Sequence, residues 1–445
     1  MSCRAAPVAF VLCFLPMPSL VLSSGAAWAK EPAEAGASAP TTRAEEWRRL
    51  RLDKLTKLEP YRPGFLERNL LAIEKAERPS IMQLNFWGFY PRFQSVASGS
   101  QQTAGLRFWQ PEIKGSPWDV HGSLFYSTAG YEYYDLQVGM VPHKGRRFPL
   151  RSTKEDDVYE LGDARRRLSR LIAYASLRYR HFPQEDFFGL GEGSRRQDHS
   201  TFLLQDASYE LVTGIQLTRH LAATVRTGFL QASLGPGEED PFPTTQELFD
   251  DETAPGLLRQ PDFLRFTGQL FLDHRDEPGN PHRGAMAALQ VSRVDDRGGR
   301  AFQYTRLAAD LRAYVPLGSP QRVLALRAFA NRDDPDRGSR VPFYMAETLG
   351  GSHTLRGFRN FRFRGEKLLL LQAEYRWEAA PALELALFVD AGKIAGTDAR
   401  LDLSDLEADY GVGVRVKTFD DLLVRFDVAR SREDTRLLFR FSASF

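Results

Sequence analysis

A strict alternation of apolar and polar residues, which begins near Ile81 and continues to the last residue, most constrains how this chain can fold. In 410–417, for example, Tyr410 and three valines alternate with two glycines, Arg415 and Lys417. Successive side chains of a β-strand point to opposite faces of its sheet, so each such segment has one apolar and one more polar face. The pattern predicts an all-β fold for residues 81–445.

Sixteen segments carry this pattern. They lie near 81–91, 101–110, 117–128, 130–141, 168–180, 200–215, 219–232, 261–273, 284–294, 301–315, 321–331, 366–377, 383–391, 408–417, 421–429 and 435–445. An even number of antiparallel strands, each about ten residues long, is typical of a bacterial transmembrane β-barrel.

Two architectures accommodate amphipathic strands: a soluble sandwich with its apolar faces inward, and a membrane barrel with its apolar faces toward lipid. The apolar faces end in aromatic residues such as Tyr375, Trp377 and Phe439, as the aromatic girdles of barrels do. The polar faces carry charges that a packed interior would not tolerate. These include Arg306, Arg312, Arg415, Arg425 and Arg440. We expect a 16-stranded antiparallel transmembrane β-barrel, with a soluble Greek-key protein as the alternative.

Composition alone would suggest a soluble protein. Mean hydropathy is −0.38, and 59 Lys and Arg against 57 Asp and Glu give a net charge of +2. A barrel explains this because only alternate strand residues face lipid. No uncharged apolar run after residue 29 approaches the roughly 20 residues of a transmembrane helix, which excludes a multi-span helical protein. The near-neutral charge gives no indication of a nucleic-acid partner.

Residues 1–29 have the features of a signal peptide: Arg4, an apolar stretch, and the small-x-small site Ala-Trp-Ala at 27–29. Cleavage near Ala29 would remove both cysteines of the chain, which excludes disulfides and thiolate metal sites in the mature protein. Export combined with a barrel predicts the bacterial outer membrane.

Residues 30–80 are expected to form a linker and two short helices, over 42–59 and 64–77, in the periplasm or in the lumen. If the first strand runs outward, the long connections are extracellular and the short turns periplasmic. The long ones are 181–199, 233–260 and 332–365; the short ones are 316–320, 378–382 and 418–420. The connection 142–167 breaks this rule.

Four motifs along the barrel resemble those of one family. They are DFFGLG at 186–191, DHRDEP and NPHRG at 273–278 and 280–284, LGGSHTLRGF at 349–358 with FRG at 363–365, and FVDAG at 388–392. They resemble the bacterial surface antigen or outer-membrane assembly factor superfamily, the BamA/TamA-like barrels, over about 81–445. The resemblance implies a barrel that aids insertion or translocation of proteins or lipids at the outer membrane.

The resemblance also implies a site in the loop 332–365. In the family this loop folds into the lumen and its arginine pairs with carboxylates on neighbouring strands. The matching motif here is Leu355, Arg356, Gly357 and Phe358. Strand parity places Glu374 and Asp390 on the lumen face, so we expect both to pair with Arg356 in a bidentate contact that Lys would not replace. The alternative is that Arg356 is a solvated loop charge.

Both ends of the chain have features that indicate which partners to expect. Phe441 and Phe445 share a face of the last strand and resemble the C-terminal signal by which barrels are recognised, so the chain is expected to be a client of the barrel assembly machinery. Family members that insert or secrete proteins carry periplasmic POTRA domains. Residues 30–80 are too few for one and are expected to be helical, which puts a full insertase activity in doubt.

No catalytic constellation is evident. The eight histidines are dispersed without metal-ligand spacing, and no Gly-x-Ser-x-Gly elbow occurs. Asp198, His199 and Ser200 are consecutive and so cannot converge as a triad does. We expect no enzyme activity, cofactor or metal. The function hypothesis is therefore membrane biogenesis; the alternative is a passive channel whose five lumen arginines, Arg306 to Arg440 above, favour anions.

Overall fold

The computed structural model describes residues 42–56, 87–94, 103–110, 113–140, 170–237, 241–276, 280–380, 383–397, 399–417 and 422–440. The chain divides into two units, Met1–Arg62 and Pro63–Phe445. In the first, helix α1 (Arg43–Thr56) lies within the expected range 42–59 and begins with a capping box between Thr42 and Glu45. No helix among the described residues combines the length and hydrophobicity of a transmembrane helix.

The second unit is built from one 16-stranded antiparallel sheet, β1 to β11 followed by β14 to β18. Its strands are β1 (Phe89–Gln94), β2 (Thr103–Gln110), β3 (Asp119–Ser127), β4 (Glu132–Met140), β5 (Leu171–Phe187), β6 (Ser200–Gln216), β7 (Leu221–Pro236), β8 (Phe263–Asp273), β9 (Gly284–Asp296), β10 (Tyr304–Pro316), β11 (Arg322–Pro335), β14 (Lys367–Ala380), β15 (Leu383–Ala395), β16 (Glu407–Lys417), β17 (Leu422–Ser431) and β18 (Thr435–Arg440).

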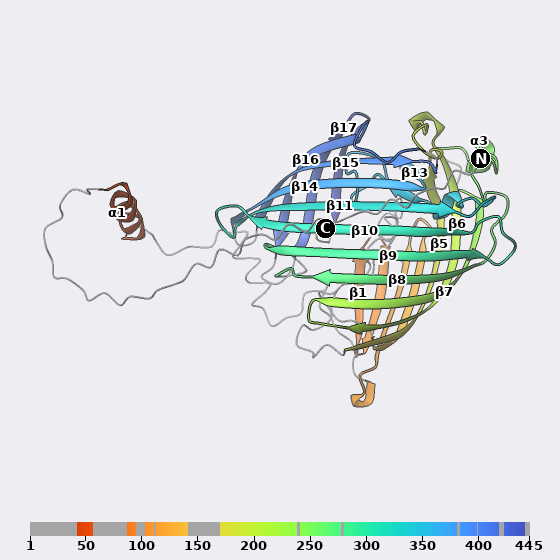
Figure 1. The fold of residues 1–445 in the computed structure, drawn as a ribbon, viewed down its shortest axis with the longest axis horizontal. Coiled ribbons are helices and arrows are strands. Elements are labelled where there is room, and N and C mark those ends of the chain that lie inside the picture. The colour runs from red at the N-terminus through yellow and green to blue at the C-terminus, as the bar shows by residue number, and fades with distance from the viewer. Residues whose placement is uncertain are drawn as a thin grey trace, which may run out of the picture. The chain divides into compact units, whose positions relative to one another are not determined.

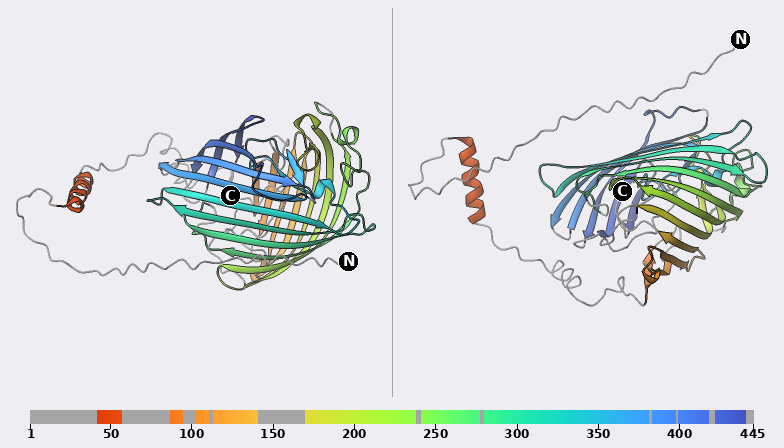
Figure 2. Two further views of the ribbon diagram at one scale, coloured as in Figure 1. Left: turned by 45° about the horizontal axis from the view of Figure 1, so that its top comes forward. Right: turned by 60° about the horizontal axis from the view of Figure 1, so that its bottom comes forward.

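Each strand of this sheet pairs with its neighbours in sequence, and the sheet curls around an interior (Figures 1 and 2). The predicted all-β class and its sixteen strands are confirmed. No ladder between β1 and β18 occurs among the described residues, so these two strands are the sheet's free edges there. The other elements are short: η2 (Ile113–Gly115), η3 (Arg196–Asp198), α3 (Thr245–Leu248), η4 (Phe343–Met345), β12 (Glu347–Leu349) and β13 (Phe363–Gly365).

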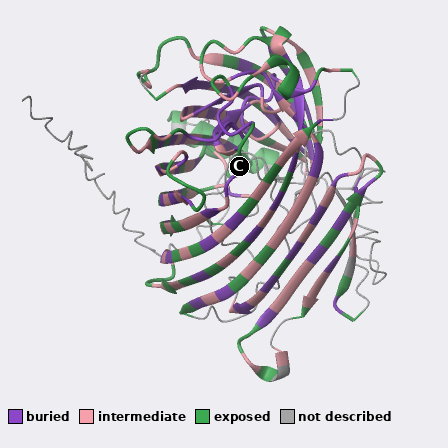
Figure 3. Ribbon diagram, turned by 90° about the vertical axis from the view of Figure 1, so that its right-hand side faces the viewer, coloured by how far each residue is buried: buried purple, intermediate pink, exposed green. Residues whose placement is uncertain are grey.

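The two faces of the sheet have opposite polarity, and Figure 3 shows buried and exposed residues alternating along the strands. The outward face is apolar and uncovered: Leu387, Val412 and Phe426 are more than half exposed. The inward face carries buried charges, including Glu374 and Arg415. This inverts the arrangement of a soluble protein and is the polarity of a transmembrane β-barrel. It removes the soluble Greek-key alternative.

Strand β5 is longer than predicted. The alternation indicated an end at 180 and a connection 181–199, whereas β5 continues to Phe187 and the connection is 188–199. The ladder with β6 shifts register between Phe182 and Glu185, which flank Pro183. Because proline has no N–H to donate, the period is interrupted there, and pairing resumes after the bulge.

Several predictions of the sequence lie outside the described residues. These are the signal peptide 1–29, the helix 64–77, the connection 142–167, and the C-terminal Phe441 and Phe445. The connections between described strands do alternate in length. Those after β5, β7 and β11 are long and lie at one end of the sheet, which we call the long-loop end; the turns after β6 and β10 are short and lie at the other.

Candidate functional site

The connection from β11 to β14, residues 336–366, folds back against the lumen face of the sheet. Its two short strands, β12 and β13, pair antiparallel from Glu347↔Gly365 to Leu349↔Phe363. This pairing closes a narrow hairpin whose tip, residues 350–362, reaches the inner wall. We call residues 350–362 the loop tip.

Glycines shape the start of the loop tip. Gly350 and Gly351 have φ of 112° and 98°, a region that side chains other than glycine rarely adopt. A Cβ on Gly350 would lie 2.0 Å from the Arg359 carbonyl oxygen. The Gly351 amide donates to the carbonyls of Leu355 and Phe358, at 3.0 and 3.1 Å. The turn therefore fixes how the following Leu-Arg-Gly-Phe motif faces the wall.

Two apolar residues of the motif anchor the loop tip. Leu355 and Phe358 are fully buried in one apolar cluster, and the ring of Phe358 meets that of Phe363 edge-on, with centroids 5.2 Å apart. The rest of the cluster comes from the loop and the wall: Leu349, Ala308, Phe329, Leu368, Leu370 and Ile394. Residues on β10, β11, β14 and β15 thus form a socket for the tip.

Between these anchors Arg356 points into a group of carboxylates. Its Nε lies 2.6 Å from Asp390 Oδ2 and its Nη2 2.8 Å from Asp390 Oδ1, a bidentate contact. Its Nη1 lies 2.8 Å from Glu374 Oε2 and 3.7 Å from Asp427 Oδ2. The guanidinium carbon also stands 3.4 Å from the centre of the Phe388 ring. The structure thus brings together Arg356 and both of its expected partners.

Burial and the neighbouring carboxylates have opposite effects on the pKa of Arg356. Burial alone would lower the pKa of the guanidinium, but the charge and hydrogen bonds of Asp390, with the charges of Glu374 and Asp427, raise the pKa above its ordinary value. Arg356 therefore stays charged although only 1% exposed. It contributes a fixed fork of donors that a lysine would not reproduce.

Further ion pairs surround this contact. Arg415 lies 2.8 Å from Glu384 and also pairs with Glu374, while Arg425 pairs with Asp427. The connected network comprises the guanidinium groups of Arg356, Arg376, Arg415 and Arg425 and the carboxylates of Glu374, Glu384, Asp390 and Asp427. Strands β14 to β17 and the loop tip are joined by one buried set of charges, which we call the brace network.

The loop tip also contacts the last two strands. The Ser431 hydroxyl at the end of β17 donates to the Gly357 carbonyl at 2.8 Å. Arg362 makes three contacts of 2.9 to 3.1 Å with the Glu433 carboxylate in the β17–β18 turn. Arg436 of β18 donates to the Phe358 carbonyl. One loop thus touches both the middle of the C-terminal wall and the edge strand.

A second arginine, Arg364 in β13, is buried at the base of the hairpin. Its Nη2 lies 2.8 Å from Glu185 Oε1 and its Nη1 donates to the Phe343 carbonyl at 3.0 Å. The rings within about 6 Å of its guanidinium are those of Phe187, Phe202, Phe343 and Phe361. Burial lowers the pKa of Arg364, and Glu185 only partly offsets this.

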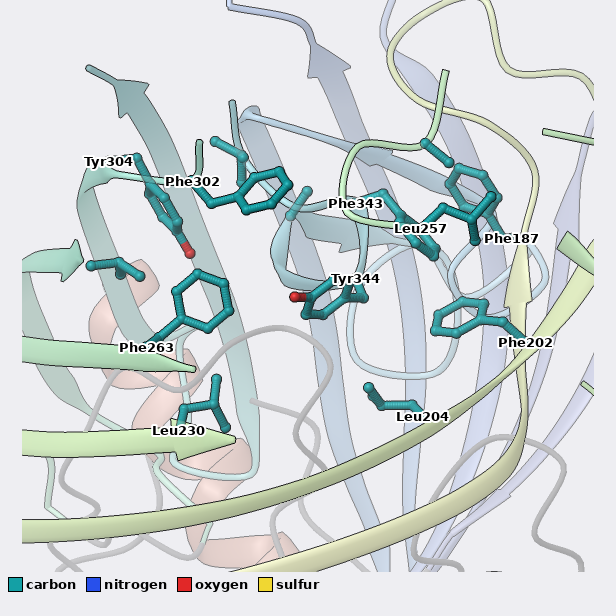
Figure 4. Packing of buried hydrophobic residues seen from close by; sticks show 14 residues of the cluster. Phe187, Phe202, Leu204, Leu230, Leu257, Phe263, Phe302, Tyr304, Phe343 and Tyr344 are labelled. Carbon is teal, nitrogen blue, oxygen red and sulfur yellow. The ribbon is translucent and has the colours of Figure 1, made fainter. Parts of the chain in front are cut away.

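An apolar cluster lies on the inner side of the sheet at the long-loop end (Figure 4). It includes Phe343 and Tyr344 of the loop, Phe263 of β8 and Phe202 of β6, and Leu257 from the β7–β8 connection. Phe343 lies 4.8 and 4.9 Å, ring centre to ring centre, from Phe187 and Phe202. The loop therefore packs against β5 and β6.

Five arginines were expected to make the lumen cationic, but carboxylates lie beside most of them. Arg415 and Arg425 belong to the brace network. Arg306 contacts the carboxylates of Asp333 and Glu347 at 2.6 and 2.9 Å, and Arg312 contacts Asp310 at 2.7 Å. Arg440 faces His353 of the loop tip. Four of the five are thus paired with carboxylates, because buried guanidinium groups require carboxylate partners, which occupy the same face.

Two of the other three motifs lie beside the same loop. The 186–191 segment ends β5 and hydrogen-bonds to β13, with the Gly191 amide 2.8 Å from the Arg364 carbonyl. FVDAG lies in β15 and supplies Phe388 and Asp390. The 273–284 segment forms the β8–β9 turn at the opposite end, where His282 contacts Glu378 of β14 at 3.0 Å.

The one histidine that resembled part of a hydrolase site has another partner. His199 Nε2 lies 2.9 Å from Asp186, and its ring stacks on Phe188 with centroids 4.3 Å apart. Within the described ranges, no three His, Cys, Asp or Glu side chains gather in a way that could hold a metal ion.

Sequence reasoning missed the rest of the brace network. Glu384, Arg376, Gln372 and Asp427 all have lumen parity, which was available from the alternation, but no motif distinguished them from other polar lumen positions. Arg364 and Glu185, the ion pair at the base of the hairpin, are 179 residues apart and carry no periodic signal.

Together these features define an outer-membrane β-barrel with one long loop docked on its inner wall. The chain belongs to the Omp85 superfamily, whose domain model matches residues 90–445. This is a family of outer-membrane protein insertion and translocation, and the chain is accordingly a bacterial outer-membrane protein. No curated protein matches the sequence.

Solved structures agree on the fold. BamA from Haemophilus ducreyi, in a crystal structure lacking POTRA domains 1–3, has a TM-score of 0.55 and 14% identity, over 80% of this chain and 70% of that one. CdiB from Acinetobacter baumannii has a TM-score of 0.47 and 9% identity, over 80% and 60%. The first likeness supports a common barrel; the second is too weak to support more.

Proposed function

We propose that the chain helps to insert or translocate proteins or lipids at the outer membrane, using the edge between β1 and β18, and that the docked loop braces this edge. The family assignment supports the first part. The observation that carries the second is the position of the loop tip, which is held by the brace network on β14 to β17 and also contacts the β17–β18 turn and β18.

The bracing role follows from which strands the loop tip contacts. Arg356 fixes the tip to β14 and β15, which lie within the sheet. Ser431 and Arg436 then connect the same short segment to β17 and β18. Among the described residues, β18 is hydrogen-bonded to a strand on one side only. The contacts from the loop tip therefore hold β18 in place where a second neighbouring strand would otherwise do so.

A passive anion channel is the alternative, and two observations disfavour it. Most lumen arginines named for it are paired with carboxylates. At the long-loop end, the loop adds an apolar cluster to the lumen side of β5 to β10 around Phe343. An open aqueous pore needs a polar, hydrated lining.

We include in this proposal how the chain is targeted to the outer membrane. Residues 1–29 are taken as a signal peptide cleaved near Ala29, and Phe441 and Phe445 as the signal by which the barrel assembly machinery recognises the chain as a client. The lipid of the outer membrane is then its surroundings, and a protein or lipid its substrate. We propose no enzymatic role.

Deletion of the gene tests the biogenesis function. We expect depletion of other outer-membrane proteins or altered surface lipids, with recovery on expressing the wild-type chain and little recovery with Arg356→Ala. Planar-bilayer recordings test the alternative: a large, stable, anion-selective current in the wild type that Arg356→Ala leaves unchanged would favour the channel and contradict the brace.

A further inference from the structure

Asp409 on β16 is a buried carboxyl group that the brace network does not pair. Its side chain points to the lumen and the residue is only 1% exposed. Neither of its carboxylate oxygens has a hydrogen-bond donor among the residues that the structure describes. The backbone amide of Gly357, in the loop tip, is a donor that approaches this carboxyl group. An ionised carboxylate in such a place is strongly unfavourable.

On one side, the neighbour of Asp409 is a carboxylate that already accepts several hydrogen bonds. Asp390 is its direct partner in the β15–β16 ladder. Asp390 accepts hydrogen bonds from Arg356 at 2.6 and 2.8 Å and from Gln372 at 3.0 Å. Three donors thus hold Asp390 as a hydrogen-bond acceptor.

On the other side Asp409 faces a hydroxyl group that is already committed. Ser431 is its partner in the β16–β17 ladder. The Ser431 hydroxyl donates to the Gly357 carbonyl at 2.8 Å and accepts from the amides of Glu433 and Asp434, both at 3.1 Å. Its single proton is therefore used by the loop tip, which also covers Asp409 at Gly357.

No guanidinium group of the brace network forms an ion pair with Asp409 in the part of the chain that the structure describes. Arg312 and Arg327, farther along the wall, both contact Asp310. Arg356 from the loop tip is the cation that acts on both Asp390 and Asp409. The other charged groups near the tip are Glu374 from β14, Arg415 from β16, Arg425 and Asp427 from β17, and Arg436 and Arg440 from β18.

We propose that Asp409 carries a proton in the docked state at neutral pH and donates it to Asp390, so that the two side chains form a carboxyl–carboxylate pair beneath the loop tip. The proton supplies the donor that Asp409 lacks. The inference concerns how the loop is held and goes beyond the proposed function, because it does not depend on what the barrel inserts.

The proposal fixes the sign of a pH dependence. When the loop tip leaves, water reaches Asp409 and the carboxyl group ionises, so the docked state binds one more proton than the undocked state. Docking is therefore favoured at lower pH and weakens as the pH rises. With one proton involved, the undocked fraction grows by up to about tenfold per pH unit.

Infrared spectroscopy of the full-length chain in lipid vesicles tests the proton directly. At neutral pH we expect the C=O stretching band of a buried, protonated carboxyl group, which disappears in Asp409→Asn. Asparagine is neutral and nearly isosteric, so this variant should remain folded and lose the pH dependence of loop docking. Asp310→Asn, which removes a buried carboxylate that already has two arginine partners, should leave the band unchanged.

The opposite outcomes overturn the proposal. If the Asp409→Asn spectrum loses carboxylate intensity and keeps the protonated band, Asp409 is ionised. If docking instead depends on whether sodium or a bulky organic cation is present, a bound cation balances the charge. Titration of the wild type needs no variant: the band should vanish as the pH rises, and its absence at neutral pH would contradict the proposal even if Asp409→Asn does not fold.

Discussion

The two buried arginines of the loop, Arg356 in its tip and Arg364 at its base, show two ways of holding a guanidinium group away from water. Arg356 faces three carboxylates, and its pKa is raised. Arg364 faces one carboxylate, Glu185, among aromatic rings, and its pKa is lowered. The groups are chemically identical and almost equally buried, so the difference comes from their surroundings.

From this difference we infer which of the two arginines contributes more to holding the loop in place. Removing Arg356 would take the guanidinium partner from Asp390 and one of the counter-charges from Glu374 and from Asp427, on three separate strands. Removing Arg364 would take the partner from one carboxylate, Glu185, in a site whose aromatic walls would accept an apolar side chain. We therefore regard the tip as the energetic anchor of the loop and the base as a packing contact.

Arg356→Met should have the largest effect. It removes the guanidinium partner of Asp390 and one counter-charge each from Glu374 and Asp427. Loss of one partner of a buried ion pair costs about 3–5 kcal/mol, here toward the upper end. Thermal unfolding in lipid, followed by the gel shift of folded against unfolded barrel, measures it. Arg356→Lys is the matched control and should lose less, since charge remains without the bidentate fork. Equal losses would contradict the geometric argument.

Arg364→Met should cost about 3 kcal/mol, at the lower end of the same range, because only one carboxylate, Glu185, loses an arginine partner. Adding Glu185→Gln removes that charge, and the double variant should return to within about 1 kcal/mol of the wild type. The same gel-shift melting checks both. A double variant that remains as unstable as Arg364→Met would show that the base is also held by charge.

Gly357→Ala should cost about 1–3 kcal/mol through overpacking. A Cβ at this position would lie 2.7 Å from the Asp409 Cβ and 2.9 Å from the Ser431 Cβ, so the tip would have to move from the wall. Gly193→Ala offers a control in another loop, where a Cβ would meet nothing within 4 Å. Comparable melting of the two variants would argue against a close contact at Gly357.

Arg195→Ala should have the smallest effect. Arg195 lies 4.0 Å from Asp198, and their side chains are 71% and 40% exposed. Solvated pairs of this kind contribute little, so the change should stay within about 0.5 kcal/mol. A loss approaching that of Arg364→Met would mean that exposed loop charges matter as much as buried ones.

The strands and the partners of Arg356 were accessible from sequence because both depend on a period of two. The alternation located all sixteen strands and placed Glu374 and Asp390 on the lumen face. It failed at β5, where Pro183 interrupts the period although the strand continues. It also gave no indication of β12 and β13, which are three residues each and too short to show a pattern.

The remaining part of the site depends on distances across the sheet. Asp409 and Asp427 share the parity of Asp390, but only the register of β15, β16 and β17 shows which of them reaches the loop tip. The carboxylate partners of the lumen arginines were not predicted, for a related reason: parity identified Arg306 and Arg312 as lumen residues and could not show that Asp333 and Asp310 lie beside them.

The most direct test of the account is the accessibility of the loop tip in the membrane. Thr354 is 2% exposed and lies beside Arg356, so Thr354→Cys, in a chain whose Cys3 and Cys13 are replaced by serine, reports docking by its reaction with a membrane-impermeant maleimide. Leu258→Cys, at a position 77% exposed in the β7–β8 connection, gives the rate of an open site.

The account predicts slow labelling of Thr354→Cys in the otherwise wild-type barrel and with Arg364→Met. Labelling should approach the Leu258→Cys rate only when Arg356→Met is added. Fast labelling with Arg356 intact, or the same slow rate with and without Arg356, would contradict the claim that this arginine holds the loop against the inner wall.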